Sequence, residues 1–565
     1  MLINAKTING DLFRRLLISG AINLQNNIRT INNLNVFPIP DGDTGDNMYL
    51  TLKGGVDQII SVNDDTLGKE AVALANGMLL NARGNSGVIL SQLFFGLSEG
   101  LANLKEATLT EFAYAMGKGV ERAYKAVAEP VEGTILTVAR ESIDFSRANI
   151  DEKTTVKDFF TTVLEEMKKS LEKTPELLEV LKESGVIDSG GAGLVCIIEG
   201  FLKAFDNENA LEEVAVSINE NTQKSVDFSK FNEDSVMEFG YCTEMLVQLL
   251  KSKTDVDAFS VEDLITYLNT LGDSIVAVKV GSIIKLHVHT LKPYLVMEYC
   301  QRFGEFLTVK IENMTLQHNE SELYSEKKEE KSSLEELNSK VKRARKDFAV
   351  ITVANGDGII EMFTELGADY VVRGGQTNNP SSEDFIRAFD EVNADTIFVL
   401  PNNSNIILAA KQAAEIYKDS DVRIIPSKSL GQGYSALSMI DLGLGNVDAI
   451  EESIIEAMSG TLTGMVSPAV RTTVCNGVSV NEGDYMGFSN KEMIVSTPSK
   501  IQTVCELAKT LLTEDKSIIL ALYGKNATEE ERLAFSSFAS ESLSSAELYE
   551  IDGKQDVYDF ILIVE

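Results

Sequence analysis

Several residue types are scarce in this chain of 565 residues, and each scarcity narrows what the protein can be. The five cysteines are scattered and odd in number, which argues against a disulfide framework and favours a reducing cytoplasm. No apolar run reaches the roughly 18 residues of a membrane-spanning helix. The N-terminus also lacks the charged and apolar segments of a signal peptide. We therefore expect a cytoplasmic protein without a transmembrane segment.

Basic residues are also scarce relative to acidic ones. The chain has 51 Lys and Arg residues and 86 Asp and Glu residues, so its formal net charge is −35. Such a charge would be repelled by a phosphate backbone, so we expect no nucleic-acid partner and no anionic membrane surface as a partner. Solubility is the ordinary explanation of this acidity.

The order of sequence patterns predicts several domains. Residues 1–205 contain apolar positions at three- and four-residue steps, as in Phe112, Met116 and Val120, joined by Gly-rich loops. This pattern predicts a bundle of amphipathic helices. Residues 225–325 mix alternating β-branched runs with short helical patterns, which predicts a small α+β domain.

The rest of the chain has two further patterns. Residues 326–345 are charged and nearly free of Gly and Pro, which predicts an exposed helical linker. Residues 346–565 alternate short apolar strands with helices, which is typical of a parallel α/β fold, and they end in a second sub-domain.

An acidic loop stands out in the first region. In "NVFPIPDGDTGDNMYLTL", Asp41, Asp43 and Asp46 fall close together among Pro and Gly. Clustered carboxylates repel each other unless a cation neutralises them, and Mg²⁺ favours one or two carboxylates with phosphate oxygens and water. The loop lacks the ligand spacing of an EF-hand. The alternative is a solvated polar turn, because Pro-Asp-Gly is a common turn signal.

A second loop, "ARGNSGVILSQLFFGL", offers a site for an anion. Gly84, Asn85, Ser86 and Gly87 precede an apolar helical run, and free N–H groups at a helix start bind phosphate well. The alternative is an ordinary helix cap by Asn85 or Ser86. Together the two loops predict a site for a phosphate and its metal ion.

These motifs resemble a known family. "LNVFPIPDGDTGDNM", "ARGNSGVILSQ", "PVEGTILTVARES" and "GVIDSGGAGL" look like the nucleotide-binding helical barrel of the dihydroxyacetone kinase L subunit. The match is closer still to the ATP-binding subunit of bacterial fatty acid kinase. That resemblance covers essentially the whole chain, including "FGYCTEMLV" and "KLHVHT" in the middle. Near the end, "VRGGQTNNPSSEDF" looks like a DegV-type segment.

The resemblance implies an all-α helical barrel that holds ATP and two Mg²⁺ ions. Asp41 and Asp43 match the catalytic metal-binding pair of the family. Its relatives carry a third Asp where this chain has Asn35, so Asn35 or Asp46 would complete the magnesium ligands. The further residues expected beside the nucleotide are Thr44, Gly45, Asn47, Asn85, Ser86, Gly87, Thr134 and Asp188.

The resemblance also implies an activity. The family phosphorylates a fatty acid that a separate DegV-like protein presents, which gives an acyl phosphate for phospholipid synthesis, and it is expected to form homodimers. An ionised carboxylate needs no strong general base, which agrees with the absence of His from residues 1–205. The alternatives are a dihydroxyacetone or triose kinase and a non-enzymatic ATP-binding regulator. A triose kinase normally needs a histidine-bearing substrate domain, and residues 346–565 contain no His.

Two expectations concern the remaining domains. His287 and His289 lie two apart on an expected strand and, with Cys242, match positions of a Zn²⁺ site in the resembling family. His318 would be a fourth ligand or a residue facing the partner, and packed or surface histidines are the alternative. The DegV-like domain would either bind lipid or act as a scaffold that docks the partner, which we favour. Its polar loop residues suit turns and helix caps: Gly374, Gly375, Thr377, Asn379 and Ser381.

Overall fold

The computed structural model describes residues 5–35, 42–61, 66–206, 241–256, 259–280, 282–313, 345–376, 378–469, 472–475, 477–489 and 492–565. The chain divides into two compact units. One unit joins Met1–Ala210 with Ala344–Glu565, and the other is Leu211–Arg343. The N-terminal and C-terminal regions therefore pack together although they are far apart in sequence.

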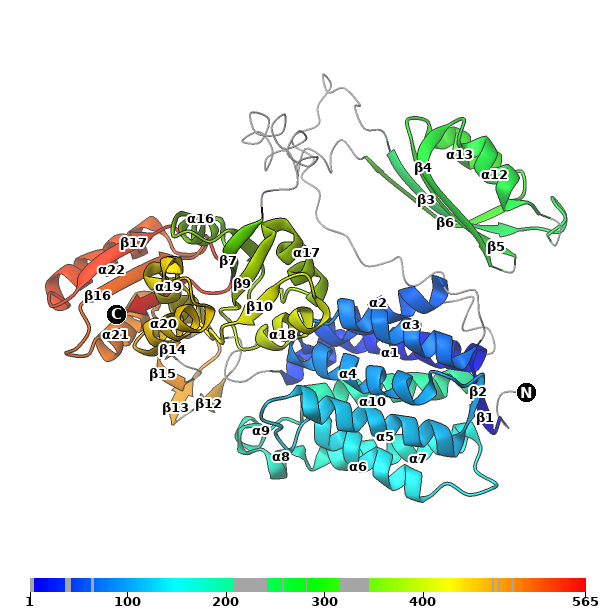
Figure 1. The fold of residues 1–565 in the computed structure, drawn as a ribbon, viewed down its shortest axis with the longest axis horizontal. Coiled ribbons are helices and arrows are strands. Elements are labelled where there is room, and N and C mark those ends of the chain that lie inside the picture. The colour runs from blue at the N-terminus through cyan, green and yellow to red at the C-terminus, as the bar shows by residue number, and fades with distance from the viewer. Residues whose placement is uncertain are drawn as a thin grey trace. The chain divides into compact units, whose positions relative to one another are not determined.

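The N-terminal region is a domain of packed helices, coloured blue to cyan in Figure 1. Its helices begin where the sequence offers caps: Thr108 and Thr155 each form a capping box with the acidic residue three positions later. Its elements are β1 (Thr7–Asn9), α1 (Gly10–Leu34), α2 (Thr44–Ser61), α3 (Leu67–Leu80), α4 (Gly84–Leu101), β2 (Glu106–Thr108), α5 (Leu109–Ala126), α6 (Ile135–Ala148), α7 (Val156–Glu172), α8 (Thr174–Leu177), α9 (Glu179–Ser184) and α10 (Ser189–Asp206).

Aromatic rings fill the interior between these helices. Phe13, Phe112, Phe160 and Phe201 follow one another in edge-to-face contacts, with ring centroids 5.3–6.2 Å apart. Phe159 joins the row at Phe160. This geometry is favourable beyond the area buried. The rings come from α1, α5, α7 and α10, so the apolar faces predicted from the helical spacing meet in one core.

The C-terminal region begins with a parallel sheet in the order β10-β9-β7-β8. On β7, Ala349, Ile351 and Val353 face one hydrophobic cluster, while Val350 and Ala354 face another, so both sides of the strand are buried. The elements of this half are β7 (Lys346–Ala354), α16 (Asp357–Glu365), β8 (Tyr370–Arg373), α17 (Ser382–Val392), β9 (Ala394–Leu400), α18 (Ile407–Ile416), β10 (Asp421–Ile424), α19 (Leu430–Met439), the 3₁₀ helix η3 (Leu442–Leu444) and α20 (Val447–Ser459).

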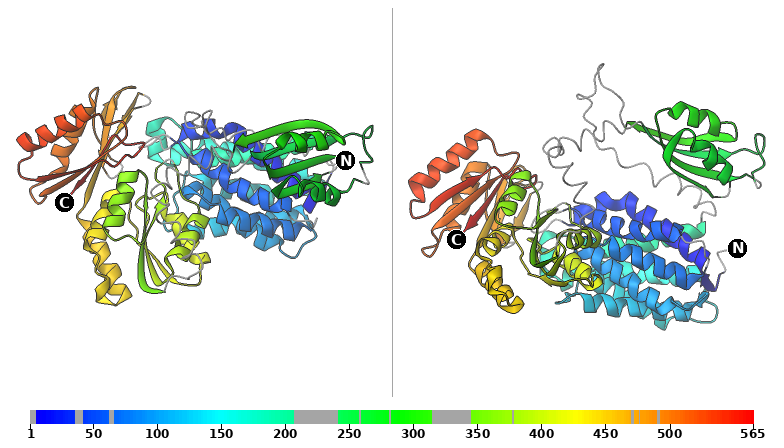
Figure 2. Two further views of the ribbon diagram at one scale, coloured as in Figure 1. Left: turned by 90° about the horizontal axis from the view of Figure 1, so that it is seen from above. Right: turned by 45° about the horizontal axis from the view of Figure 1, so that its top comes forward.

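A six-stranded mixed sheet, in the order β15-β14-β11-β18-β16-β17, forms the other half. Figure 2 shows the orange and red helices α21 and α22 along one of its faces. The elements are β11 (Leu462–Pro468), β12 (Thr473–Cys475), β13 (Val478–Val480), β14 (Tyr485–Ser489), β15 (Glu492–Thr497), α21 (Lys500–Leu511), β16 (Ile518–Tyr523), α22 (Glu529–Ser542), β17 (Glu547–Ile551) and β18 (Phe560–Val564).

The second unit contains an antiparallel sheet in the order β4-β5-β3-β6. Met245, Leu286 and Val296 belong to its hydrophobic core. Its elements are β3 (Tyr241–Leu249), α12 (Val261–Leu268), β4 (Gly272–Val280), β5 (Ile283–Thr290), α13 (Pro293–Cys300) and β6 (Gly304–Asn313).

The structure confirms the predicted helical N-terminal domain and the parallel α/β pattern of the C-terminal domain. The closed barrel and the exact domain boundaries stay predictions. The predicted linker helix falls on residues 326–344, which lie outside the described residues. Within the part of the chain that the structure describes, no helix combines the length and apolar character needed to cross a membrane.

Candidate functional site

Helix α2 begins directly after the acidic loop. Asp43 precedes its first turn and is only 6% exposed, and the neighbouring polar residues Thr44 and Asn47 are also buried. The main-chain N–H of Asn47 donates to the main-chain carbonyl of Asp43 at 2.8 Å, which closes the first turn of the helix. The predicted ligand Asp41 lies outside the described residues.

Helix α4 begins beside α2, at the predicted phosphate loop. Gly84 has a positive φ of 56°, and a Cβ atom there would lie 2.6 Å from Nδ2 of Asn47. A Cβ atom on Gly87 would lie 2.4 Å from Oγ1 of Thr51. Glycine at both positions therefore allows the first turn of α4 to pack closely against α2.

Helix α10 is the third to begin in this place. Ser189, its first residue, donates a hydrogen bond to the Thr44 hydroxyl at 3.3 Å. The Ser189 hydroxyl was not among the predicted site residues, although its position after Asp188 at a Gly-rich helix start was a usable signal. The first turns of α2, α4 and α10 thus bring their main-chain N–H groups and positive dipole ends to one region.

Asp188 connects the starts of α10 and α6. Its Oδ2 atom accepts from the N–H of Gly191 at 2.7 Å, and the N–H of Ile135 also donates to it. Burial raises the pKa of the Asp188 carboxyl to about 6, against the opposing effect of these two N–H donors. Thr134, also predicted to lie near the nucleotide, caps α6 by accepting from Leu136 N–H at 3.4 Å.

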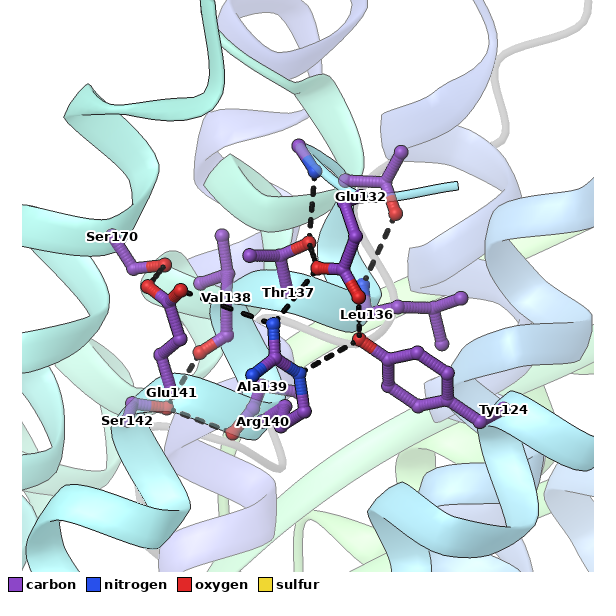
Figure 3. A network of polar contacts seen from close by, with 12 residues as sticks. Tyr124, Glu132, Leu136, Thr137, Val138, Ala139, Arg140, Glu141, Ser142 and Ser170 are labelled. Carbon is purple, nitrogen blue, oxygen red and sulfur yellow. Dashed lines mark hydrogen bonds and ion pairs between the residues drawn. The ribbon is translucent and has the colours of Figure 1, made fainter. Parts of the chain in front are cut away.

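A polar network holds the "PVEGT" loop before α6, as Figure 3 shows. Glu132 accepts from Thr137 at 2.6 Å, from Arg140 at 2.8 Å and from Tyr124 at 3.1 Å. Burial raises the pKa of Glu132, but these donors outweigh it and hold the pKa below its usual value. The Glu132 side chain is half exposed, so we assign the network to loop structure.

A cavity of about 730 Å³ lies at the helix starts of α2, α4 and α10. The carboxyl ends of the parallel strands in the C-terminal domain line its opposite side, where ligands of open α/β sheets usually bind. The lining residues from the helical domain are Asn35, Asp43, Thr44, Asn47, Asn85, Ser86 and Ser189. The lining residues from the C-terminal domain include Asn355, Gln376, Asn402, Asn403, Asn405 and Lys428.

Six of the predicted site residues therefore line one cavity, with Asn35 and Asp43 among them. Asp46, the other candidate for the third magnesium ligand, is exposed and accepts from Nδ2 of Asn32 at 2.7 Å. Asn32 also accepts from the N–H of Gly45 at 2.7 Å, so Asp46 and Gly45 are tied to α1. The other predicted site residues that the structure describes do not line the cavity: Gly45, Asp46, Gly87, Thr134 and Asp188.

The two domains of this unit meet next to the cavity. Asn379 Nδ2 donates to Oδ2 of Asp43, and Arg83 Nη1 donates to the carbonyl of Asn379 at 3.0 Å. Ser381 forms the predicted helix cap, as part of a capping box with Asp384. The contact of Asn379 with the acidic loop was not predicted, because it joins residues 336 positions apart.

The predicted zinc site lies in the second unit. In the antiparallel register of β3 and β5, Cys242 pairs with His289 and Glu244 pairs with His287. His318 lies outside the described residues, as does Thr377 of the C-terminal loop. The side chains of Cys242, His287 and His289 also lie outside the described part of the structure, and no metal-ligand cluster of three or more His, Cys, Asp and Glu occurs within that part. The zinc site therefore stays a prediction.

Sequence comparisons agree with this architecture. Residues 38–203 match the DAK2 domain, residues 238–321 match the middle domain of FakA-like fatty acid kinase proteins, and residues 349–565 match the C-terminal domain of the same proteins. Protein YloV of Bacillus subtilis is 39% identical over 568 residues, which cover 100% of both chains. An uncharacterized protein of Staphylococcus aureus strain USA300 is 36% identical over 562 residues and 99% of both chains.

Some solved structures are similar to parts of the chain. Dihydroxyacetone kinase from C. freundii, in complex with AMP-PNP and Mg²⁺, is 15% identical over 34% of this chain and 33% of its own, with a TM-score of 0.27. DegV, a fatty acid binding protein from Bacillus subtilis, is 12% identical over 39% of this chain and 99% of its own, with a TM-score of 0.30.

Proposed function

Because the chain belongs to the FakA-like family of fatty acid kinase proteins, we propose that it transfers the γ-phosphoryl group of ATP to a fatty acid carboxylate. A separate DegV-like protein would present that fatty acid, and the product would be an acyl phosphate. The observation that carries the proposal is the cavity in which the starts of α2, α4 and α10 meet Asp43. Helix N-terminal ends and a buried carboxylate beside them suit a polyphosphate and its cation.

The residues at this cavity fit Mg²⁺ and ATP. Asp43 offers a carboxylate, Asn35 offers an amide oxygen, and Oδ1 of Asn85 is buried without a hydrogen-bond partner among the described residues. Such hard oxygen atoms are the ligands that Mg²⁺ prefers. Asp41, Asp43 and Asn35 would hold the ions, which when bound neutralise charge on the phosphates.

The protein's own groups would perform positioning. The first-turn N–H groups of α4 and α10 would hold phosphate oxygens, together with the hydroxyl groups of Thr44 and Ser86. A carboxylate oxygen of the fatty acid would form a bond to the γ-phosphorus while the bond from that phosphorus to the β,γ-bridging oxygen breaks, which releases ADP. The nucleophile is already ionised at neutral pH, so no side chain has to remove a proton.

The assay that tests this function compares three acceptors. We expect ADP release with ATP, Mg²⁺ and an oleate-loaded DegV-like protein, and trapping of the product by hydroxylamine as an acyl hydroxamate. Turnover with dihydroxyacetone instead would indicate a triose kinase. Nucleotide binding without turnover on either acceptor would indicate a regulator.

We also propose that the C-terminal domain docks the acyl carrier and does not itself hold lipid. Its part of the cavity mixes apolar residues such as Met465 and Ile561 with amide side chains such as Asn403 and Asn405, and the amides suit polar contacts better than an acyl chain. Native mass spectrometry of the purified chain should find no bound fatty acid. A stoichiometric lipid would overturn this assignment.

Three further properties are proposed from the family resemblance. They are a second Mg²⁺ at the nucleotide, Zn²⁺ bound by Cys242, His287, His289 and His318, and a homodimer. Elemental analysis of wild type and His287→Ala tests the zinc, because a zinc content unaffected by that substitution removes the site. Light scattering of the full chain tests the dimer.

A further inference from the structure

A short piece of the C-terminal domain pairs with the segment that leads into the phosphate loop. Arg83 forms an antiparallel bridge with Ser381, and the N–H of Ser382 donates to the carbonyl of Ala82 at 3.3 Å. Arg83 and Asp384 also form an ion pair at 3.8 Å. The loop before α17 is therefore held by main-chain and side-chain bonds directly beside Gly84.

The contact between the domains continues along α4 and α18. Asn85 donates to Oδ1 of Asn405 at 3.1 Å, and Gln92 donates to Oε1 of Gln412 at 2.8 Å. Ala82 and Val88 of the helical domain belong to the hydrophobic core of the parallel sheet. Such shared burial and paired amides are typical of a specific interface.

Asn379 is the residue of this interface that reaches the acidic loop. It is 2% exposed, its Nδ2 donates to Oδ2 of Asp43, and its main-chain carbonyl accepts from Arg83. An ionised carboxylate only accepts hydrogen bonds, so the amide nitrogen must face Asp43. The amide oxygen of Asn379 is buried without a partner among the described residues.

The space around this contact is closely filled. A Cβ atom on Gly84 would lie 3.3 Å from Nδ2 of Asn379, in addition to its clash with Asn47. The Asn379 amide thus lies between the phosphate loop and the acidic loop. One Asp43 oxygen accepts from this amide, so the bond helps to orient the carboxylate.

We propose that Asn379 is a positioning residue for Asp43, so that the nucleotide site of the helical domain is completed by the C-terminal domain of the same chain. This inference rests on the proposed role of Asp43 in holding Mg²⁺. Hydrogen bonds that orient a metal-binding carboxylate typically change metal affinity or activity by about 10–100-fold. The C-terminal domain would then act on the phosphates as well as on the acyl carrier.

The test titrates the full chain with AMP-PNP by calorimetry at several Mg²⁺ concentrations. We expect Asn379→Ala to raise the Mg²⁺ concentration at half saturation by about 10–100-fold. Gln412→Ala is the matched control, because Gln412 is buried in the same interface but contacts Gln92 and the Leu79 carbonyl. It should lower thermal stability and leave the Mg²⁺ dependence unchanged.

A second variant separates positioning from packing. Asn379→Asp places a carboxylate against Asp43, and like charges at this distance disfavour each other unless a cation lies between them. We expect its Tm to be low without metal and to recover more than that of the wild type when Mg²⁺ and AMP-PNP are added. A purely structural role for Asn379 predicts the same loss of Tm with and without metal.

The outcomes that contradict the inference are distinct. Wild-type Mg²⁺ dependence in Asn379→Ala would overturn it. Faster turnover of that variant in the acceptor assay would also overturn it, because the contact would then restrain the reaction. Failure of the wild-type chain to bind AMP-PNP would overturn the proposed function as well. If Asn379→Ala does not fold, Asn379→Leu, which has a similar size but no N–H group to donate to Asp43, makes the same test.

Discussion

The two sides of the cavity are built from opposite ends of secondary structure. The helical domain contributes the N-terminal ends of α2, α4 and α10, where the helix dipoles favour anions. The C-terminal domain contributes the carboxyl ends of β7, β8, β9 and β10, followed by loops rich in Asn and Gln.

This difference assigns different tasks to the two sides. Main-chain N–H groups at helix ends have fixed directions and need little side-chain help, so Gly and Ser are sufficient there. Loops after parallel strands vary in length and composition without disturbing the sheet, so they can orient neighbouring groups. We expect substitutions on the helical side to affect the phosphates most strongly.

The largest effect should come from Asp43. Asp43→Asn removes the carboxylate that faces the cavity, and we expect turnover to fall by about 10²–10³-fold through lost charge stabilisation. Asp46→Asn is the control, because Asp46 is exposed and bonded to Asn32. Steady-state rates at saturating ATP measure both variants. Equal losses would mean that Asp46 belongs to the metal site.

The next effect concerns the close approach of α4 to α2. Gly84→Ala should lower the free energy of unfolding by about 2–4 kcal/mol, because the left-handed backbone and the contact with Asn47 are both unfavourable. Gly185→Ala has a similar φ of 65° but meets nothing within 4 Å, so it should cost only about 1 kcal/mol. Denaturant unfolding measures the difference between the two variants. Similar losses of unfolding free energy would mean that the contact with Asn47 has no effect on stability.

A smaller effect depends on pH at Asp188. Its carboxyl has a pKa of about 6 in the folded chain, above the roughly 3.9 of an unfolded chain, so folding favours the protonated form. Its contribution to stability is therefore greatest below pH ~4 and declines as the pH rises to ~6, by about 1–3 kcal/mol in total. Asp188→Asn should remove this decline in unfolding measured from pH 4 to 7.

An acidic residue with the opposite shift provides the control for Asp188. Hydrogen bonds from Thr155 hold the pKa of Asp158 below its usual value, so its contribution is present at neutral pH and is lost as the pH falls. Asp158→Asn should therefore change the pH dependence with the opposite sign. The same sign in both variants would contradict these assignments.

The smallest effect should come from the Glu132 network. The Arg140 and Glu132 side chains are 39% and 49% exposed, so their ion pair is screened by solvent. Glu132→Gln should change the free energy of unfolding by less than about 1 kcal/mol, and added salt should reduce the difference further. A larger loss would contradict the screening of this ion pair, and a loss of AMP-PNP binding would place the network in the nucleotide site.

Much of the fold follows from local sequence patterns. The helical domain, the parallel strands and the cap at Ser381 depend on spacing and on side chains within a few residues, which are visible in the sequence. The barrel closure and the domain boundaries depend on contacts between distant elements, so they stay predictions. The predicted site residues that line the cavity lie close to the starts of α2 and α4 or just after the end of α1.

The distinction between Asn35 and Asp46 had no local basis. Both lie near Asp43 in sequence, and charge alone favours Asp46 as a magnesium ligand. In the structure Asn32 donates to the Asp46 carboxylate while Asn35 lines the cavity, and the choice between them as a magnesium ligand stays a prediction. A side chain's direction depends on its neighbours in space, and those neighbours belong to another helix.

By itself, the sequence determined that Gly84 stands at a helix start and that Asp43 lies in an acidic loop, since glycines, turn residues and apolar spacing act over a few residues. Only the tertiary structure brought α2, α4 and α10 to one cavity and placed Asn379 on Asp43. The physical reason is that this hydrogen bond joins two domains, and it forms only after the buried surfaces around Ala82 and Val88 have packed.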